Sequence, residues 1–232
     1  KHFLGTGLVE PVDDLRATNP PSNAALWDYL NNQFVQSDFD LKHLIRLILN
    51  SQTYQRSAST HPENQHDVRF YSHAQARRLP AEVLLDAIGA ATGEPEQFAG
   101  YPLGIRAIQV PDPGLDSYFL TLFGRSERVT ACACERSGDV TLPQLLHLQN
   151  SDSLTARIRS ADGRLQQLLS SGATDHRIIE VLFQATLTRQ PAADEQAAVI
   201  AQLSSASTID RSEVFQDLFW ALLNSREFAF QH

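Results

Sequence analysis

The chain has 232 residues, of which 42% are apolar and 20% charged, and 27 acidic against 19 basic residues give a net charge of −8. This length is enough for a sizeable hydrophobic core in one or two domains, and the composition excludes a disordered or collagen-like chain. The negative charge has the wrong sign for a protein that binds the phosphate backbone of nucleic acids. No stretch reaches the roughly 18 apolar residues that a membrane-spanning helix needs. We therefore expect neither a nucleic-acid partner nor a transmembrane segment in this chain.

The first part of the chain combines a turn-rich arm with two helical patterns. Residues 5–21 are rich in turn formers and predict an irregular arm. Ser22 is expected to cap a helix over residues 24–36, and Asp40 is expected to cap the next helix. The apolar residues of this second helix have the spacing i, i+3, i+4, i+7 of one helical face: Leu41, Leu44, Ile45 and Ile48.

The middle of the chain is less regular. Residues 52–78 lose the helical period and predict a long polar loop, of a length that compact domains reserve for functional or mobile segments. A helix over 80–92 follows, and Gly93 is expected to end it. The alternating pattern of residues 105–110 predicts one short strand or extended segment, and a short helix is expected over 113–123.

Helical patterns dominate the C-terminal part, where we expect helices over 163–170, 175–188, 192–204 and 211–226. The short gaps between them favour antiparallel neighbours in a bundle. The expected fold class is therefore mainly α, with an irregular, loop-rich N-terminal half that holds at most one short strand or hairpin, and a C-terminal antiparallel helical bundle. We expect a single domain over 1–232, loop-rich over about 1–138 and a bundle over about 139–232.

Charged and potentially reactive side chains are most concentrated in residues 123–136, which contain both cysteines. Arginine neighbours favour the thiolate form, so Cys132 and Cys134 could be reactive or bind a metal. The pair lacks the third and fourth ligands of a closed zinc site, so we favour a structural disulfide with ion pairs and expect no metal. His147 could supply a third ligand, although a lone histidine on a leucine-rich helix is more often a partly buried core residue. The catalytic candidates of this segment are Arg125, Arg128, Glu135 and Arg136.

Two further charged clusters are candidates for binding. The carboxylates of the N-terminal arm suit acid–base or sugar-binding work, although capping and salt bridging are the simpler interpretation. Arg77 and Arg78 come directly before the helix expected over 80–92. Arg78 and Glu82 have the i, i+4 spacing of an ion pair. The binding candidates are Asp13, Asp14, Arg16, Arg77 and Arg78.

Other signatures of enzymes and metal sites are absent from the sequence. His61, His66 and His73 have spacings that match no regular ligand geometry. There is no phosphate-binding glycine loop, no nucleophile elbow, no zinc-protease motif and no haem-attachment motif. Common enzyme classes therefore lose most of their support, and whether the chain is an enzyme stays open.

Seven blocks of the sequence, taken in order, resemble the Planctomycete Secreted Domain family, a C-terminal domain of unknown function: GLVEPVDDLR at 7–16, NPPS at 19–22, DLKHLIR at 40–46, RRLPAE at 77–82, FGR at 123–125, CACER at 132–136 and WALLNSREF at 220–228. The resemblance covers essentially the whole chain. It implies a secreted or periplasmic multidomain parent, commonly with a further domain of unknown function and a c-type cytochrome domain upstream. The family pattern has a helix before Phe3, so we expect an N-terminally truncated fragment.

The residues and the resemblance together lead to two functional hypotheses. The first is a binding or accessory module of a secreted, cytochrome-linked protein in polysaccharide use or extracellular electron transfer. The alternative is a redox or hydrolytic enzyme whose site around Cys132 and Cys134 is completed by the upstream domain. The expected partners are that upstream domain and a polysaccharide. No cofactor is expected in this chain, and the resemblance allows a haem c in another domain of the parent.

Overall fold

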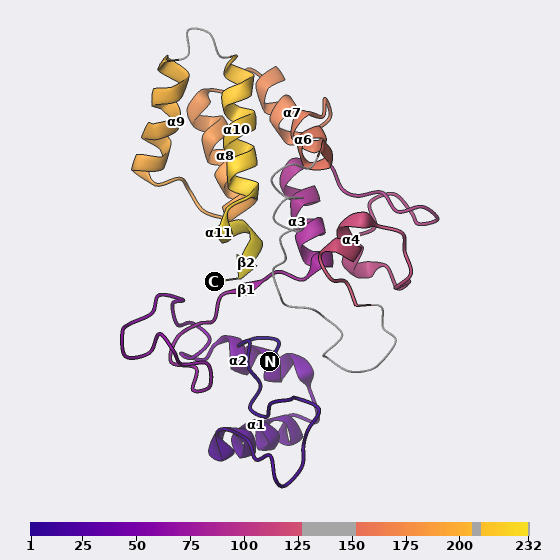
Figure 1. Cartoon of the computed structure of the whole chain (residues 1–232), viewed down its shortest axis with the longest axis vertical. Helices are drawn as coiled ribbons and strands as arrows, with labels where there is room; N and C mark the ends of the chain where they lie inside the picture. The colour runs from indigo at the N-terminus through magenta and orange to yellow at the C-terminus, as the bar shows by residue number, and fades with distance from the viewer. Residues whose placement is uncertain (127–151, 206–209, 232) are drawn as a thin grey trace. The chain divides into compact units, whose positions relative to one another are not determined.

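A computed structural model of the chain describes residues 1–126, 152–205 and 210–231. The described residues are mainly α-helical with a single pair of two-residue strands, so the expected fold class is confirmed (Figure 1). They divide into two compact units, residues 1–77 and residues from 78 onward. The expected change from loops to bundle near residue 138 lies outside the described residues. None of the described helices has the length and apolar character to cross a bilayer.

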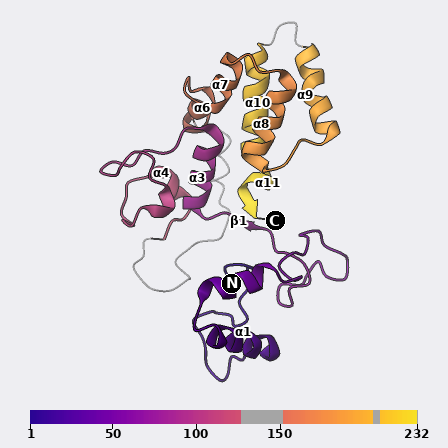
Figure 2. The ribbon, with the colours of Figure 1, turned by 180° about the vertical axis from the view of Figure 1, so that it is seen from behind.

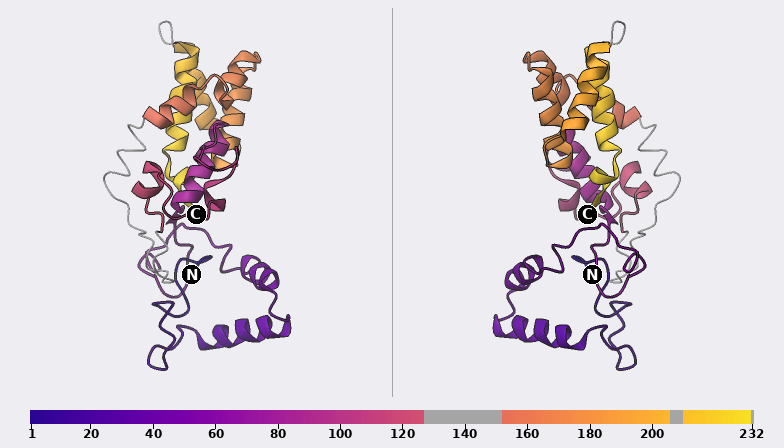
Figure 3. Two further views of the ribbon diagram at one scale, coloured as in Figure 1. Left: turned by 90° about the vertical axis from the view of Figure 1, so that its right-hand side faces the viewer. Right: turned by 90° about the vertical axis from the view of Figure 1, so that its left-hand side faces the viewer.

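The first unit contains the N-terminal arm, helix α1 (Ala24–Gln36), helix α2 (Leu41–Leu49) and a long loop (Figure 3). Asp40 caps α2 as expected, because its side chain accepts a hydrogen bond of 2.8 Å from the Lys42 N–H. Ser22 was the wrong cap for α1: the Asn23 side chain accepts from the Leu26 N–H at 3.0 Å. Asn23 lies in the correct position, directly before the first helical residue.

The first unit buries little of its apolar surface. Among residues 1–77, Gly7 and Val9 are buried, and no residue of α1 or α2 is. The apolar face of α2 is strongly patterned, and the apolar side chains of both helices stay partly exposed. This unit therefore leaves accessible apolar surface of the kind that binding sites use.

The second unit holds the remaining elements: β1 (Arg77–Arg78, with its first residue at the unit boundary), α3 (Ala81–Thr92), the 3-10 turn η1 (Ala107–Gln109), α4 (Tyr118–Leu122), α6 (Asp152–Arg159), α7 (Arg164–Ser170), α8 (Asp175–Leu187), α9 (Ala193–Ser205), α10 (Arg211–Leu223), α11 (Arg226–Ala229) and β2 (Phe230–Gln231). Helices α8, α9 and α10 contact one another and lie side by side in both views (Figures 1 and 2). The core includes fully buried side chains from α3, α8 and α10, among them Leu84, Ile178, Leu182, Phe215 and Phe219.

Three expected elements differ in this unit. Residues 105–110 do not form a strand: the Asp86 carboxylate of α3 accepts from the N–H groups of Ala107 at 2.7 Å and Ile108 at 3.2 Å, and these bonds stabilise the 3-10 turn. Helix α4 begins at Tyr118 behind the cap residue Ser117, rather than at 113. The helix expected over 211–226 is two helices, because Ser225 accepts from the Phe228 N–H at 3.1 Å and starts α11.

Candidate functional site

A cleft of about 880 Å³ lies within the first unit. Its walls come from the N-terminal arm, α1, α2 and the loop as far as Tyr71. The lining is mostly aliphatic and aromatic, with Trp27 from α1 and Phe70 and Tyr71 from the loop. Clefts of roughly 300–1,000 Å³ with an apolar lining and a few polar groups are typical of small-molecule and cofactor sites. The first unit therefore contains the best candidate for a binding site in the described chain.

Backbone hydrogen bonds hold the arm against the rest of the first unit. The Ser22 N–H donates to the Leu8 carbonyl at 2.7 Å, which places the arm beside the start of α1. The guanidinium of Arg77 donates to the carbonyls of His2 and Phe3, both at 3.0 Å. The sequence candidate Arg77 is thus a positioning residue for one wall of the cleft.

The loop that carries the two aromatic residues is held by a carboxylate. Asp67 accepts from the backbone N–H groups of Arg69, Phe70 and Ser72, at 2.9, 2.8 and 3.0 Å. The Ser72 side chain and these N–H groups hold the pKa of Asp67 well below its ordinary value. The Tyr71 hydroxyl in turn donates to the Thr6 carbonyl at 3.1 Å, which joins the loop to the arm. The aromatic side of the cleft is therefore pre-organised.

The charged groups of the cleft are all basic. The lining includes Lys1, Arg46, Arg56 and His43 and no aspartate or glutamate. Lys1 pairs with Glu10, which lies outside the lining, at 3.0 Å. Arg56 donates to the Tyr71 carbonyl at 2.8 Å, and no carboxylate partner of Arg46 or Arg56 lies in the described part of the chain. Two guanidinium groups are thus available to a ligand.

The acidic candidates of the arm lie next to this cleft. The Arg16 guanidinium makes two contacts with the Asp14 carboxylate, at 2.5 and 2.6 Å, and this pairing lowers the pKa of Asp14. Leu15 between them lines the cleft and is 67% exposed. The structure therefore places Asp13, Asp14 and Arg16 beside the cleft, with Asp14 and Arg16 occupied by each other.

Arg78 and Arg125 both make contacts within the second unit near the end of α4. Arg78 donates to the Phe123 carbonyl at 3.1 Å and lies over the Phe123 ring. Arg125 donates to the Val110 carbonyl at 2.9 Å, and its Nε is 3.9 Å from Glu82 Oε1. The side chains of this pair are 5% and 6% exposed. Such a buried pair joins α3 to the end of α4 and offers no open surface to a substrate.

The remaining candidates lie outside the described residues: Arg128, Cys132, Cys134, Glu135, Arg136 and His147. The disulfide, the metal alternative and an enzyme site around the cysteines therefore stay hypotheses. Within the described ranges, no group of three metal-ligating side chains gathers, the loop histidines included.

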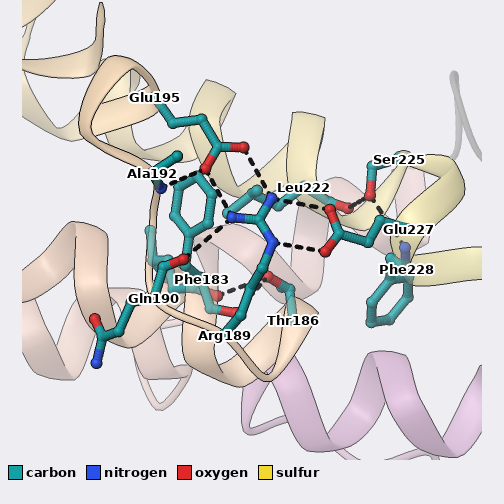
Figure 4. A network of polar contacts seen from close by, with 11 residues as sticks. Phe183, Thr186, Arg189, Gln190, Ala192, Glu195, Leu222, Ser225, Glu227 and Phe228 are labelled. Atoms are coloured by element: carbon teal, nitrogen blue, oxygen red, sulfur yellow. Dashed lines mark hydrogen bonds and ion pairs between the residues drawn. The ribbon is translucent and has the colours of Figure 1, made fainter. Parts of the chain in front are cut away.

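Sequence reasoning missed a network around Arg189 in the second unit (Figure 4). The Arg189 guanidinium bridges two carboxylates: Glu195 at 2.7 and 2.8 Å, and Glu227 at 2.6 and 2.9 Å. It also lies over the Phe183 ring at 5.4 Å. Glu195 accepts from the Ala192 N–H at 2.7 Å, so it caps α9 as well. A glutamate in the first turn of an expected helix, as at Glu195, was the one sign in the sequence that could have pointed to this network. Since the charges are paired with one another, the network fastens α8, α9 and α11.

The network predicts a pH dependence of stability. The Arg189 guanidinium and then the Ala192 N–H lower the pKa of Glu195 from 4.5 to about 2. A folded-state pKa below the unfolded value stabilises the fold above the unfolded pKa, and this stabilisation is lost as the pH falls through the folded pKa. We expect the free energy of unfolding to fall between about pH 4.5 and pH 2, and to fall less in Glu195→Gln. Urea unfolding at several pH values measures this slope.

The control for this prediction is Asp194→Asn, which changes the neighbouring exposed carboxylate outside the network. It should keep the slope of the unaltered chain. Equal slopes for Glu195→Gln and the unaltered chain would contradict a stabilising role of the network.

Fold and cleft together define a mainly helical module with a candidate ligand site in its first unit. The chain belongs to the PSD1 family, described as a protein of unknown function (DUF1553), whose family model matches residues 1–113 and 104–203. The matched ranges include every residue of the cleft. Searches of curated proteins and of solved structures found no match.

Proposed function

We propose that the chain is an accessory binding module that holds a segment of polysaccharide in the cleft of its first unit. The observation that carries the proposal is the cleft itself, about 880 Å³ in size and bounded by aromatic side chains on two sides. A unit that buries so few of its residues gains little stability from an open apolar cleft, so binding is the better explanation of that surface.

The lining has the two kinds of group that sugar rings require. The flat faces of Trp27, Phe70 and Tyr71 suit the apolar faces of sugar rings, and the Phe70 side chain is 70% exposed. Donors from α2 and the loop, including Arg46 and Arg56, suit hydroxyl and other oxygen acceptors. Binding residues on loops that a helical scaffold positions are a common arrangement.

The setting of this module is part of the proposal. The abbreviation PSD1 agrees with the Planctomycete Secreted Domain family that the sequence blocks resemble. We extend the implications of that resemblance to this chain: a secreted or periplasmic, multidomain and cytochrome-linked parent, with any haem c in another domain and an upstream domain as a partner. Polysaccharide use then needs a module that retains the substrate, and extracellular electron transfer is the second setting.

The function is tested by removing one wall of the cleft. Phe70→Ala should weaken polysaccharide binding by about tenfold or more, because burying a phenylalanine side chain contributes roughly 1.5–3 kcal/mol. Trp27 reports binding by its fluorescence in a Trp220→Phe background, since these are the two tryptophans of the chain. The titrants are soluble galactans, glucans and polygalacturonate.

The matched control is Phe39→Ala, which removes a ring that is 61% exposed in the same unit but does not line the cleft. It should bind like the unaltered chain. If no titrant changes the Trp27 signal, or if both alanine variants bind equally well, the cleft is not a polysaccharide site.

A further inference from the structure

We infer that the cleft of the first unit selects a ligand that carries an anionic group, a carboxylate or a sulfate ester, on a partly apolar body. This inference rests on the proposed function and names the class of sugar that the site takes. Its basis is the charge of the lining, which is opposite to the charge of the chain as a whole.

The first observation is the positive charge of the residues that line the cleft. Acidic residues outnumber basic ones by 27 to 19 in the chain, yet none of them lines the cleft. Protein sites for neutral sugars need acceptors for the sugar hydroxyls, and carboxylates are the strongest acceptors in proteins. A lining with cationic donors and no carboxylate instead fits a ligand that brings its own charged acceptors.

The second observation is that the two lining arginines lack carboxylate partners among the described residues. Arg46 is an exposed residue in the last turn of α2, and no described side chain pairs with its guanidinium. Arg56 uses one N–H for the Tyr71 carbonyl and keeps its other donors. A guanidinium presents parallel N–H groups that match the oxygens of a carboxylate or sulfate.

A third guanidinium, that of Arg69, lies next to the lining residue Phe70. Arg69 lies 5.7 Å from the centroid of the Phe70 ring, so a positive charge stands beside the exposed aromatic face. Together with His43 on α2, basic groups therefore occur on both the helical side and the loop side of the cleft. The apolar residues of the lining, which include Trp27, Leu30 and Ile48, would contact the uncharged part of the ligand.

The test compares three oligosaccharides of equal length: one of galactose, one of galactose sulfate and one of galacturonic acid. Trp27 fluorescence in the Trp220→Phe background gives each dissociation constant. We expect the galacturonate or the sulfated oligosaccharide to bind at least about tenfold more tightly than the neutral one, which corresponds to one charge-assisted hydrogen bond. This difference should shrink in high salt, because the arginines are exposed. The better of the two charged ligands identifies the source of the anionic group.

Arg46→Gln should remove about tenfold of the affinity for the charged oligosaccharide and little of the affinity for the neutral one. The matched control is Lys42→Gln on the same helix, which is exposed, does not line the cleft, and should change neither affinity.

Equal binding of the neutral and charged oligosaccharides, or an unchanged affinity in Arg46→Gln, would overturn the anionic selectivity and leave the polysaccharide site intact. If none of the three binds, the proposed function fails and the inference fails with it.

Discussion

Phe219→Ala is expected to lower the free energy of unfolding of the second unit by about 3–5 kcal/mol. The Phe219 side chain is fully buried in the core cluster, on a helix that contacts α6, α8 and α9. Removing the ring loses its transfer free energy and leaves a cavity that the packed helices can fill only in part. Because a domain of this kind is stable by only about 5–15 kcal/mol, the loss is a large fraction of the total. Urea unfolding followed by circular dichroism measures it.

The neighbouring residue supplies the control. Trp220 is 36% exposed on the same helix, so Trp220→Ala removes a larger side chain with less buried surface. It should cost clearly less than Phe219→Ala. The reverse order would show that the packing of α10 differs from the structure.

Arg125→Met is expected to destabilise the chain by about 3–5 kcal/mol, as when one partner of a buried ion pair is removed. Methionine keeps the length of the side chain and removes the charge, so the Glu82 carboxylate loses the cation beside it in a buried setting. The Val110 carbonyl also loses its donor. Chemical denaturation of the purified variant measures the change in the free energy of unfolding.

An exposed pair gives the comparison for Arg125. Arg177 and Glu180 are 3.2 Å apart with side chains 58% and 38% exposed, so Arg177→Met should cost less than about 1 kcal/mol. Adding Glu82→Gln to Arg125→Met should recover part of the stability, because no buried charge then remains in the pair. A stable Arg125→Met variant would contradict the structural role of this pair.

Elements with strong local signals were predicted closely. The helix over 24–36 and the caps Asp40 and Gly93 appear as expected, since each depends on residues that are near one another in the chain. Gly93 ends α3 with a φ of 79°, a conformation that favours glycine. The bundle helices lie within a few residues of their expected ranges, because a repeated apolar face marks a helix over its whole length.

Elements that depend on distant partners were predicted less well. The 3-10 turn at 107–109 is stabilised by Asp86, which lies about twenty residues earlier and on another helix. The break between α10 and α11 follows from one serine cap inside an otherwise continuous helical pattern. Helix α6 was not expected, because its sequence is short and mostly polar. In the structure it buries Leu154 and Ile158 against the core.

The candidate site shows the same division. In the sequence, charged residues and cysteines are most concentrated in residues 123–136. The cleft is instead lined by residues that come from the arm, two helices and a loop, and that are scattered along the sequence. The apolar face of α2 and the adjacent Phe70 and Tyr71 were the available signals. Neither of these signals predicts a cleft, because the cleft forms only where the N-terminal arm lies beside α1.

The sequence by itself determined the mainly helical class, the caps and most helix ranges of this protein, and its charge disfavoured a nucleic-acid partner. These properties depend on local propensity and on composition, which the order of residues states directly. Only the tertiary structure decided that Arg125 and Glu82 form a buried pair, that Arg189 bridges two glutamates and that basic and aromatic residues line one cleft. Each of these depends on residues far apart in the chain, and their approach is set by how all the apolar faces pack at once.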